Sequence, residues 1–190
     1  MSTQIHQHHS TDGDELFDSL KGHLFEISPL GPDDEAELEA FIARLSPRTR
    51  RLRFFSPVSR LAPSLLQHLM RVDFHEKAAF VVRLRGSPEI RAVGRYELTG
   101  PGTAEVAFAV ADEYQHEGIG TELLHHLAFH ARANGIGTFS AYVLWENREM
   151  FELFRHSGYP MWSQPNAGVT EVTLSLSNEE TGPSGSSGTP

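Results

Sequence analysis

The stretch AEVAFAVADEYQHEGIGTELL, which runs from Ala104 to Leu124, decides the fold. It begins as an apolar strand, passes through a polar loop and enters a helix behind two glycines. A helix N-terminus offers unpaired backbone N–H groups, and glycines let a phosphate approach several of them at once. Gly118 and Gly120 permit that approach, and Thr121 adds a hydroxyl. Because Gly-Lys-Ser/Thr and Gly-x-Gly-x-x-Gly are both absent, this is neither a P-loop nor a dinucleotide fingerprint. A helix start without any ligand is the alternative reading.

The segments on either side of this stretch complete an orderly pattern of helices and strands. Helices come first, three strands follow, and a β-α-β-α-β order closes the chain, which indicates a single α+β (mixed α/β) domain. We expect strands at residues 23–30, 77–85, 90–99, 103–111, 138–145 and 169–176, and helices at residues 31–45, 46–55, 62–72, 118–134 and 147–158.

The two ends of the chain differ from this core. Residues 1–21 are polar and aperiodic, and we expect them to form a flexible arm. Residues 178–190 are rich in glycine and serine, which is typical of a disordered tail. One domain is therefore expected over residues 22–177.

Composition and charge exclude several classes of function. The chain of 190 residues carries a formal net charge of −9, which disfavours binding to nucleic acid and to anionic membranes. It has no cysteine, so disulfides, thiolate catalysis and cysteine-bound zinc are excluded. No apolar run approaches the roughly 18 residues of a membrane span, and the polar N-terminus is unlike a signal peptide. We expect a cytoplasmic protein.

The loop also matches a family signature. Gln115-His116-Glu117-Gly118-Ile119-Gly120 fits the Q/R-x-x-G-x-G/A pattern of the GNAT superfamily of N-acetyltransferases, which the chain resembles. WENREMFELFRHSGY is similar to the later N-x-x-A-x-x-L-Y-x-x-x-G-F element of that superfamily. Upstream, LSPRTRRLRFFSP and RVDFHEKAAFVV resemble the bacterial protein lysine acetyltransferases that modify acetyl-CoA synthetase. The resemblance spans residues 24–176.

The resemblance implies a fold and a cofactor site. The fold is a twisted mixed sheet of about six to seven strands flanked by helices, with its fourth and fifth strands splayed apart to hold acetyl-CoA. The pyrophosphate would meet the loop, the pantetheine would follow the strand, and a backbone N–H near Val110 would polarise the thioester. The implied cofactor contacts are Phe108, Ala109, Val110, Gln115, His116, Glu117, Gly118, Ile119, Gly120, Thr121 and Asn147. For Asn147, a plain helix N-cap is the alternative.

Two positions depart from the family pattern. Glu117 stands where many members carry Arg or Gly, and an acidic side chain beside a pyrophosphate is unfavourable unless it points to solvent. Phe154 stands where many members use a tyrosine to protonate the departing thiolate, and Tyr142 and Tyr159 do not fit that position. Both departures keep open a non-catalytic sensor that binds acyl-CoA.

Glu105, at the start of the central strand, is the candidate catalytic residue. A lysine amine has a pKa near ~10.4, so only roughly one in two thousand is the nucleophilic free base at neutral pH. A carboxylate beside the amine can accept its proton. Glu105 lies where the resembling lysine acetyltransferases keep their general base. The alternative is a structural glutamate that pairs with Arg95 or Arg83.

Residues on the acceptor side are less firmly indicated. Arg48, Arg50, Arg51 and Arg53 crowd one short helix. We expect Arg53 to contact an acidic surface of a partner, and Asp73 and His75 to contact a loop that bears the acceptor lysine. The alternative for the arginines is a solvated helix face that pairs with Asp33, Asp34 and Glu37.

No metal site is expected. His126 and His130 have helical spacing, but the Glu of His-Glu-x-x-His is missing. The cluster of His6, His8 and His9 could bind a metal only weakly.

The sequence thus favours an acetyl-CoA-dependent N-acetyltransferase that acts on a lysine of a protein, with acetyl-CoA synthetase as the candidate acceptor. A GNAT enzyme for a small amine and a non-catalytic acyl-CoA sensor are the alternatives. The sequence does not indicate an oligomeric state.

Overall fold

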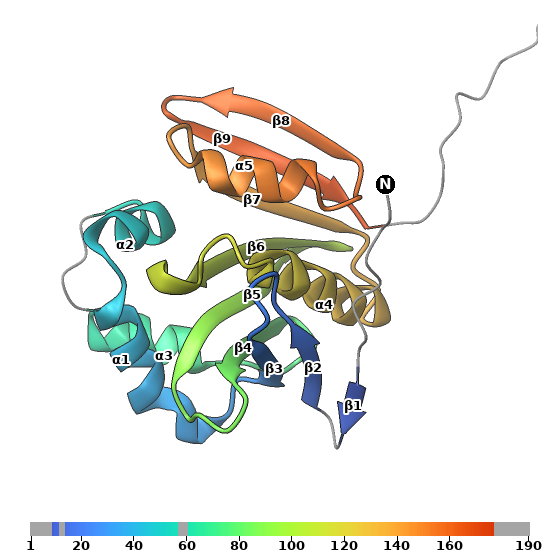
Figure 1. The fold of residues 1–190 in the computed structure, drawn as a ribbon. Helices are drawn as coiled ribbons and strands as arrows, with labels where there is room; N and C mark the ends of the chain where they lie inside the picture. Colours follow the sequence, from blue (N-terminus) through green and yellow to red (C-terminus); the bar gives the residue numbers. More distant parts are fainter. Residues whose placement is uncertain (1–8, 12–13, 57–60, 177–190) are drawn as a thin grey trace, which may run out of the picture.

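The computed structural model describes residues 9–11, 14–56 and 61–176. In this part of the chain nine strands form one sheet in the order β1-β2-β3-β4-β5-β6-β7-β9-β8 (Figure 1). The strands are β1 (His9–Thr11), β2 (Asp14–Asp18), β3 (Leu24–Pro29), β4 (Lys77–Leu84), β5 (Ile90–Gly100), β6 (Thr103–Val110), β7 (Thr138–Leu144), β8 (Met161–Asn166) and β9 (Val169–Ser175). The helices are η1 (Pro32–Asp34), α1 (Glu35–Arg44), α2 (Pro47–Phe54), α3 (Pro63–Met70), η2 (Asp112–Tyr114), α4 (Ile119–Ala133) and α5 (Arg148–Arg155).

The centre of the sheet contains the feature that creates the site. Strands β6 and β7 run parallel, whereas the other paired strands of the described chain are antiparallel. The parallel pairing covers three positions and ends where Glu105 faces Ser140. β6 continues to Val110 and β7 to Leu144, but the two strands do not pair with each other beyond this point and move apart (Figure 1). This confirms the splayed strands that the family resemblance implies.

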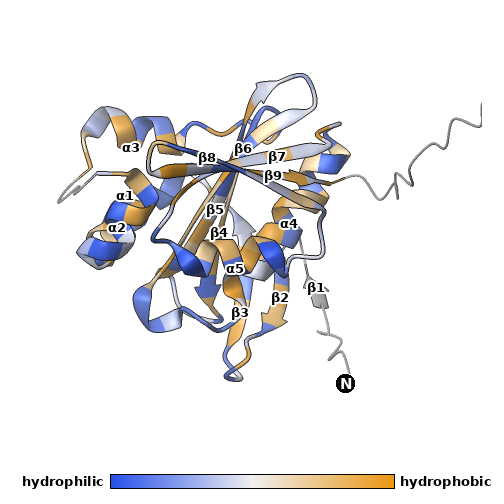
Figure 2. Cartoon of the chain, turned by 90° about the horizontal axis from the view of Figure 1, so that it is seen from above, coloured by the Kyte–Doolittle hydropathy of each residue, from blue (hydrophilic) through white to orange (hydrophobic). Residues whose placement is uncertain are grey.

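Helices cover both faces of the sheet. Along β6 the side chains alternate: Ala104, Val106 and Phe108 enter the core under α4 and α5. Ala109 belongs to a second core under α1 and α3, on the opposite face. Figure 2 shows α1, α2 and α3 on one side of the strands and α4 and α5 on the other. Glu105 has the same parity as Ala109, so it lies on the face of α1, α2 and α3.

Several helix boundaries follow from local chemistry that the sequence displays. Ser46 caps α2 by accepting a hydrogen bond from the backbone N–H of Thr49, and Pro47 takes the first helical position. Asn147 caps α5 in the same way through the N–H of Met150. α4 stops before Gly135, whose φ of 77° is in the left-handed region that glycine favours. The helices expected from the sequence are confirmed.

The N-terminal segment differs from the prediction. Residues 1–21 were expected to form a flexible arm, yet Asp14–Asp18 form β2, which pairs with β3. Phe17 is 1% exposed and stacks on Phe25, with 5.6 Å between the ring centroids. The apolar content of DELFD is small, so its strand character comes from pairing with β3 rather than from its own pattern. Residues 1–8, 12–13 and 177–190, with the predicted tail, lie outside the described residues.

The expected sheet of six to seven strands is also corrected, because β8 and the two N-terminal strands enlarge it. β8 has the sequence MWSQPN, which lacks apolar alternation and contains Pro165. It pairs with β9 alone, at the edge of the sheet, where a proline is tolerated because no ladder hydrogen bond is lost on the free side. None of the described helices is long and apolar enough to cross a bilayer.

Candidate active site

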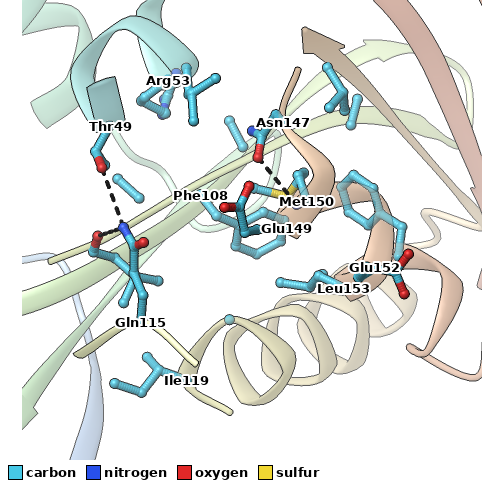
Figure 3. A pocket seen from close by; sticks show the side chains of 18 of the residues that line it. Thr49, Arg53, Phe108, Gln115, Ile119, Asn147, Glu149, Met150, Glu152 and Leu153 are labelled. Carbon is cyan, nitrogen blue, oxygen red and sulfur yellow. Dashed lines mark hydrogen bonds between the residues drawn. The ribbon is translucent and has the colours of Figure 1, made fainter. Parts of the chain in front are cut away.

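A cavity of about 570 Å³ opens between the diverging strands. Its walls come from α2, β6, the loop at residues 115–118, the first turn of α4, β7 and α5 (Figure 3). The size lies within the range of small-molecule and cofactor sites, about 300–1,000 Å³. All of the expected cofactor contacts except Glu117 line this cleft.

The loop ahead of α4 presents its backbone to the cleft. His116 and Gly118 both have left-handed backbones, with φ of 62° and 87°. In the described chain no acceptor is found for the backbone N–H groups of residues 116–120. Several unpaired donors at a helix N-terminus form a site for a phosphate group. The residues present therefore fit the pyrophosphate of a coenzyme A ester.

The two glycines of the loop have different tasks. Gly118 is needed for its left-handed backbone. A Cβ at Gly120 would lie 2.5 Å from Cδ1 of Leu153 on α5, so a larger residue there would force the Leu153 side chain to move. Since Leu153 also lines the cleft, a substitution at Gly120 would change the shape of the cleft.

Glu117 is turned neither to the ligand nor to solvent, which corrects the expectation that it contacts the cofactor. Its side chain is 2% exposed and points to the turn between β2 and β3. There Glu117 Oε2 accepts hydrogen bonds from Ser19 Oγ and His23 Nδ1, both at 2.8 Å, and Lys21 Nζ lies 3.2 Å from Oε1. The N–H of Leu20 also donates to the carbonyl oxygen of Glu117, at 3.1 Å. The segment predicted to be a flexible arm thus holds the loop in place.

The opposite side of the loop is fastened to α2. Asp112 accepts hydrogen bonds from the Ser46 hydroxyl and the Thr49 hydroxyl, each at 2.7 Å. Gln115 Nε2 donates to Val110 O and to Thr49 Oγ1 (Figure 3). Burial raises the pKa of Asp112, but the hydrogen bonds from Ser46 and Thr49 outweigh it and leave the pKa below its usual value.

Asn147 is the helix N-cap that the sequence offered as one interpretation, and its place in the cleft wall leaves the cofactor contact as a prediction. Its Oδ1 caps α5 through the N–H of Met150, at 3.2 Å, and its side chain also lines the cleft (Figure 3). The amide nitrogen remains available as a donor for a ligand in the cleft. Phe108 packs edge-on against Phe154 below, with the ring centroids 6.3 Å apart.

Glu105 lies in the cleft wall, half-buried, at the point where β6 and β7 separate. The arginines that the sequence offered as structural partners bind elsewhere. Arg83 pairs with Asp34, and Arg95 donates to the carbonyl oxygen of Leu69. The alternative in which Glu105 serves one of these salt bridges is therefore wrong.

The structure also shows which residues stand near the place where many family members carry a tyrosine. Phe154 is fully buried and offers no proton. Tyr159 packs against His125, outside the cleft wall, whereas Tyr142 on β7 lines the cleft. Tyr142 therefore presents a phenol where the family pattern gave no reason to expect one.

The arginines of α2 do not pair with the acids that the sequence suggested. Arg48 binds Glu149, with its Nη2 at 3.1 Å from Oε1, and Arg51 binds Glu146. These pairs join α2 to α5 and to the loop before it. Asp34 and Glu37 are instead engaged by Arg83 and Arg44.

Arg53 lies inside the cleft wall, not on the outer face of α2 (Figure 3). Burial and the nearby charge of Arg95 lower the pKa of Arg53, Glu105 opposes the change, and the net result is a pKa of about 10. Arg53 is still a cation at neutral pH. This position leaves the expected contact between Arg53 and an acidic surface of a partner as a prediction.

Asp73 and His75 lie outside the cleft wall. One carboxylate oxygen of Asp73 accepts the N–H groups of His75, Glu76 and Lys77, which lowers the pKa of Asp73. The His75 ring binds Asn134 at the end of α4. Their geometry is that of a capped turn, so the structure gives no support to the acceptor contacts expected of them.

The described residues contain no group of three or more side chains that could hold a metal ion. His126 binds Glu15, and His130 binds the hydroxyl of Tyr96 at 2.9 Å. Burial lowers the pKa of His130, with a smaller effect from His126. His6 and His8 lie outside the described residues.

The residues of the cleft that sequence reasoning missed include Leu20, Thr49 and Glu149. The sequence predicted the helix cap at Ser46 and the QHEGIG loop separately. It did not indicate that Gln115 of the loop would form a hydrogen bond with Thr49. Arg48 and Glu149 are separated by 101 residues, so only the folded chain brings them together.

Comparison with known proteins agrees with this geometry. Residues 48–159 match the Acetyltransferase (GNAT) family. The chain is 36% identical to acetyltransferase PA5475 of Pseudomonas aeruginosa over 148 residues, which cover 76% of this chain and 80% of that protein. It is 31% identical to acetyltransferase Pat of Mycolicibacterium smegmatis over 157 residues, covering 80% of this chain and 46% of that protein. The crystal structure of the GNAT domain of S. lividans PAT is similar with a TM-score of 0.80 and 28% identity, covering 88% of this chain and 99% of that one.

We expect Glu117→Gln to destabilise the protein in a pH-dependent way. Burial raises the pKa of Glu117, but hydrogen bonds from His23, Ser19 and Lys21 leave it below the usual value. A lowered pKa means that the ionised carboxylate stabilises the fold above the pKa of the unfolded chain and that this contribution is lost as the pH falls. The variant should lose about 1–3 kcal/mol near neutral pH, and the difference from wild type should shrink below about pH 4.3.

Urea unfolding of both proteins across this pH range measures the difference. Glu113→Gln is the control, because Glu113 is exposed and its pair with Arg91 is long, at 3.6 Å. A difference for Glu117→Gln that does not change with pH would contradict the role given to its charge.

We expect Thr121→Asp to prevent binding of acetyl-CoA without harming the fold. An acid in the first turn of a helix is favourable by about 0.3–1 kcal/mol, so the free protein should melt as before. The same charge would face the pyrophosphate. Acetyl-CoA at ~100 times its dissociation constant should raise the free energy of unfolding of the wild type by about 2.7 kcal/mol. Thr121→Asn, which has the shape of the Asp variant without its charge, should keep most of this stabilisation. Thermal melts with and without acetyl-CoA measure this stabilisation. Equal shifts of the melting temperature in the two variants would contradict a pyrophosphate site at this loop.

Proposed function

The chain belongs to the GNAT acetyltransferase family, and we propose that it transfers the acetyl group of acetyl-CoA to a lysine side chain of a protein, with Glu105 as the general base. The observation that carries the proposal is a half-buried carboxylate without a salt bridge in the described chain, at the fork of β6 and β7, in the same cleft as an unpaired amide loop.

The loop and the walls would bind the donor. The N–H groups of residues 116–120 would take the pyrophosphate, and Thr121 would add its hydroxyl. Asn147 and the exposed strand edge from Phe108 to Val110 would hold the extended arm that follows. Because Glu117 is held behind the loop by its own donors, its charge does not oppose this binding.

The acetyl group would reach the end of the cleft where Glu105 lies. The amine nitrogen would attack the thioester carbon, so that a C–N bond forms while the C–S bond breaks and coenzyme A leaves as a thiolate. Glu105 would accept the proton that the amine loses. Phe154 offers no proton to the thiolate, and coenzyme A is an acceptable leaving group near neutral pH without one.

Protein lysine as the acceptor rests on similarity. The relatives and the solved neighbour include Pat of M. smegmatis and the GNAT domain of S. lividans PAT. The upstream segments at residues 45–57 and 71–82 resemble the enzymes that modify acetyl-CoA synthetase, and that protein is the candidate acceptor. A cytoplasmic location is part of the same proposal.

We expect intact acetyl-CoA synthetase to be acetylated more efficiently than a short peptide around its active-site lysine, because a folded acceptor can contact the cleft rim as well as the cleft. Mass spectrometry of acetyl-lysine after incubation with acetyl-CoA measures both. A panel of small amines is the comparison. Equal or better acetylation of the peptide or of a small amine would favour the small-amine enzyme instead. If acetyl-CoA binds and no amine is modified, the chain is a sensor.

We expect Glu105→Gln to bind acetyl-CoA normally and to turn over about 10²–10⁴ times more slowly at neutral pH. Gln keeps the shape of the side chain but cannot accept the proton. The rate should partly recover at high pH, where solvent deprotonates the amine. The measurements are a binding titration and a pH–rate profile.

The matched control is Glu97→Gln, on β5 directly opposite Glu105. Glu97 pairs with Lys77 and His68 and is not in the cleft wall, so its loss should affect stability and leave the rate nearly unchanged. Wild-type turnover in Glu105→Gln would make Glu105 structural.

A further inference from the structure

Two arginines, the partly buried Arg53 and the buried Arg95, lie close together at the wall of the cleft, and neither forms an ion pair with a carboxylate of the described residues. Arg95 is 7% exposed and donates from Nη1 to Leu69 O at 3.1 Å. Its second terminal nitrogen, Nη2, is buried and has no hydrogen-bond partner in the described chain. Arg53 forms no ion pair with any described residue, and its guanidinium lies over the ring of Phe54, 5.0 Å from the centroid.

Arg53 separates two cavities. It lines the cleft, and it also lines a smaller cavity of about 20 Å³ that Arg95 reaches from the other side. The small cavity has room for about one water molecule. An anion that meets Arg53 must therefore approach from the cleft.

The nearby acids do not neutralise this pair of charges. Glu97 is bound to Lys77 and His68. Asp34 is bound to Arg83. Burial lowers the pKa of Arg53, and the charge of Glu105 opposes this change although the two residues form no ion pair. The proposed role of Glu105 also requires that it stay free to accept a proton. Burial lowers the pKa of Arg95 as well, and the attraction of Glu97 for Arg95 and of Glu105 for Arg53 opposes the effect of burial only in part. Placing two like charges side by side out of water without an ion pair is unfavourable. The free protein thus carries a positive charge beside the reacting end of the cleft that is only partly compensated.

We propose that Arg53, supported from behind by Arg95, binds a carboxylate that belongs to one of the two reactants. The inference rests on the proposed function and names the chemistry of its substrates. The planar guanidinium fork matches a carboxylate with two parallel hydrogen bonds. The carboxylate comes either from an acidic residue next to the acceptor lysine or from the far end of a dicarboxylic acyl group on coenzyme A. In both cases the amine would enter with a negative charge beside it, and a second cationic group next to it would be rejected.

Two binding measurements distinguish the sources, and neither depends on turnover. The donor experiment compares succinyl-CoA with acetyl-CoA by calorimetry. The acceptor experiment uses protein saturated with coenzyme A and compares two capped peptides, Asp-Lys and Asn-Lys, by NMR titration. A charge-assisted hydrogen bond contributes about 1.5–3 kcal/mol, so wild type should favour the carboxylate-bearing member of one pair by roughly tenfold to a hundredfold.

Arg53→Gln should abolish that preference, and Arg53→Lys should retain only part of it because the fork is lost. Arg85→Gln, which removes an exposed arginine from the turn after β4, should keep the full preference. Arg53→Gln should melt no lower than wild type, because it removes one of two repelling charges.

A preference in the donor pair assigns the carboxylate to the acyl group, and a preference in the acceptor pair assigns it to the peptide. Equal binding within both pairs by wild type overturns the proposal, and so does a preference that survives Arg53→Gln. The acetylation experiments are separate. Their failure would refute the proposed lysine acetylation while these titrations still decide what Arg53 binds.

Discussion

The position of the Glu117 carboxylate determines whether the loop ahead of α4 can accept the phosphate group that we propose it binds. Turned toward the cleft, the carboxylate would repel a pyrophosphate at the place where the amides attract it. Ser19, His23 and Lys21 hold it on the opposite side instead, and the N–H of Leu20 fixes the adjacent carbonyl group. The loop therefore presents its backbone to the ligand and its charge to the hairpin of β2 and β3. Asp112 and Gln115 secure the loop from the side of α2, so that hydrogen bonds within the protein hold the loop on both sides.

The point where β6 and β7 separate then fixes the distance between Glu105 and the loop ahead of α4. Pairing ends at Glu105, and the amide loop begins after the other end of β6. The five steps from Glu105 to Val110 cover roughly 17 Å at about 3.3 Å per residue. An extended ligand held by its phosphates at the loop would therefore run along the open edge of β6 to reach the carboxylate. The same divergence leaves Tyr142 and Asn147 on the far wall, facing the groove rather than a neighbouring strand.

Local sequence signals predicted what depends on local chemistry. Ser46 and Pro47 begin a helix, and the glycines of QHEGIG open α4. The place of Glu105 in the cleft was implied by the family resemblance instead, because the residues alone also allowed a structural glutamate. Interactions between distant segments could not be read in this way. DELFD is a strand because β3 provides a partner. The Glu117 carboxylate does not face the cleft, where it would repel a phosphate group, because side chains of residues 19–23 bind it on the other side. Asp73 and His75 were suggested by the resemblance, but the Asp73 carboxylate caps a turn and the His75 ring binds Asn134. Arg53 looked like part of a solvated helix face because the charge pattern of α2 does not reveal which side of the helix meets the sheet.

The choice of basic residue also agrees with the chemistry of the cleft. Of the 16 basic residues, only Lys21 and Lys77 are lysines. Lys21 pairs with Glu117 and Lys77 with Glu97, and neither lysine lines the cleft. The arginines that line the cleft, Arg48, Arg53 and Arg148, carry guanidinium groups. A guanidinium keeps its charge at neutral pH and offers no free-base amine to a thioester, whereas a lysine buried at the position of Arg53 would lose its proton more readily. An arginine there can attract an anion to the reacting end of the cleft without competing with the acceptor for the acetyl group.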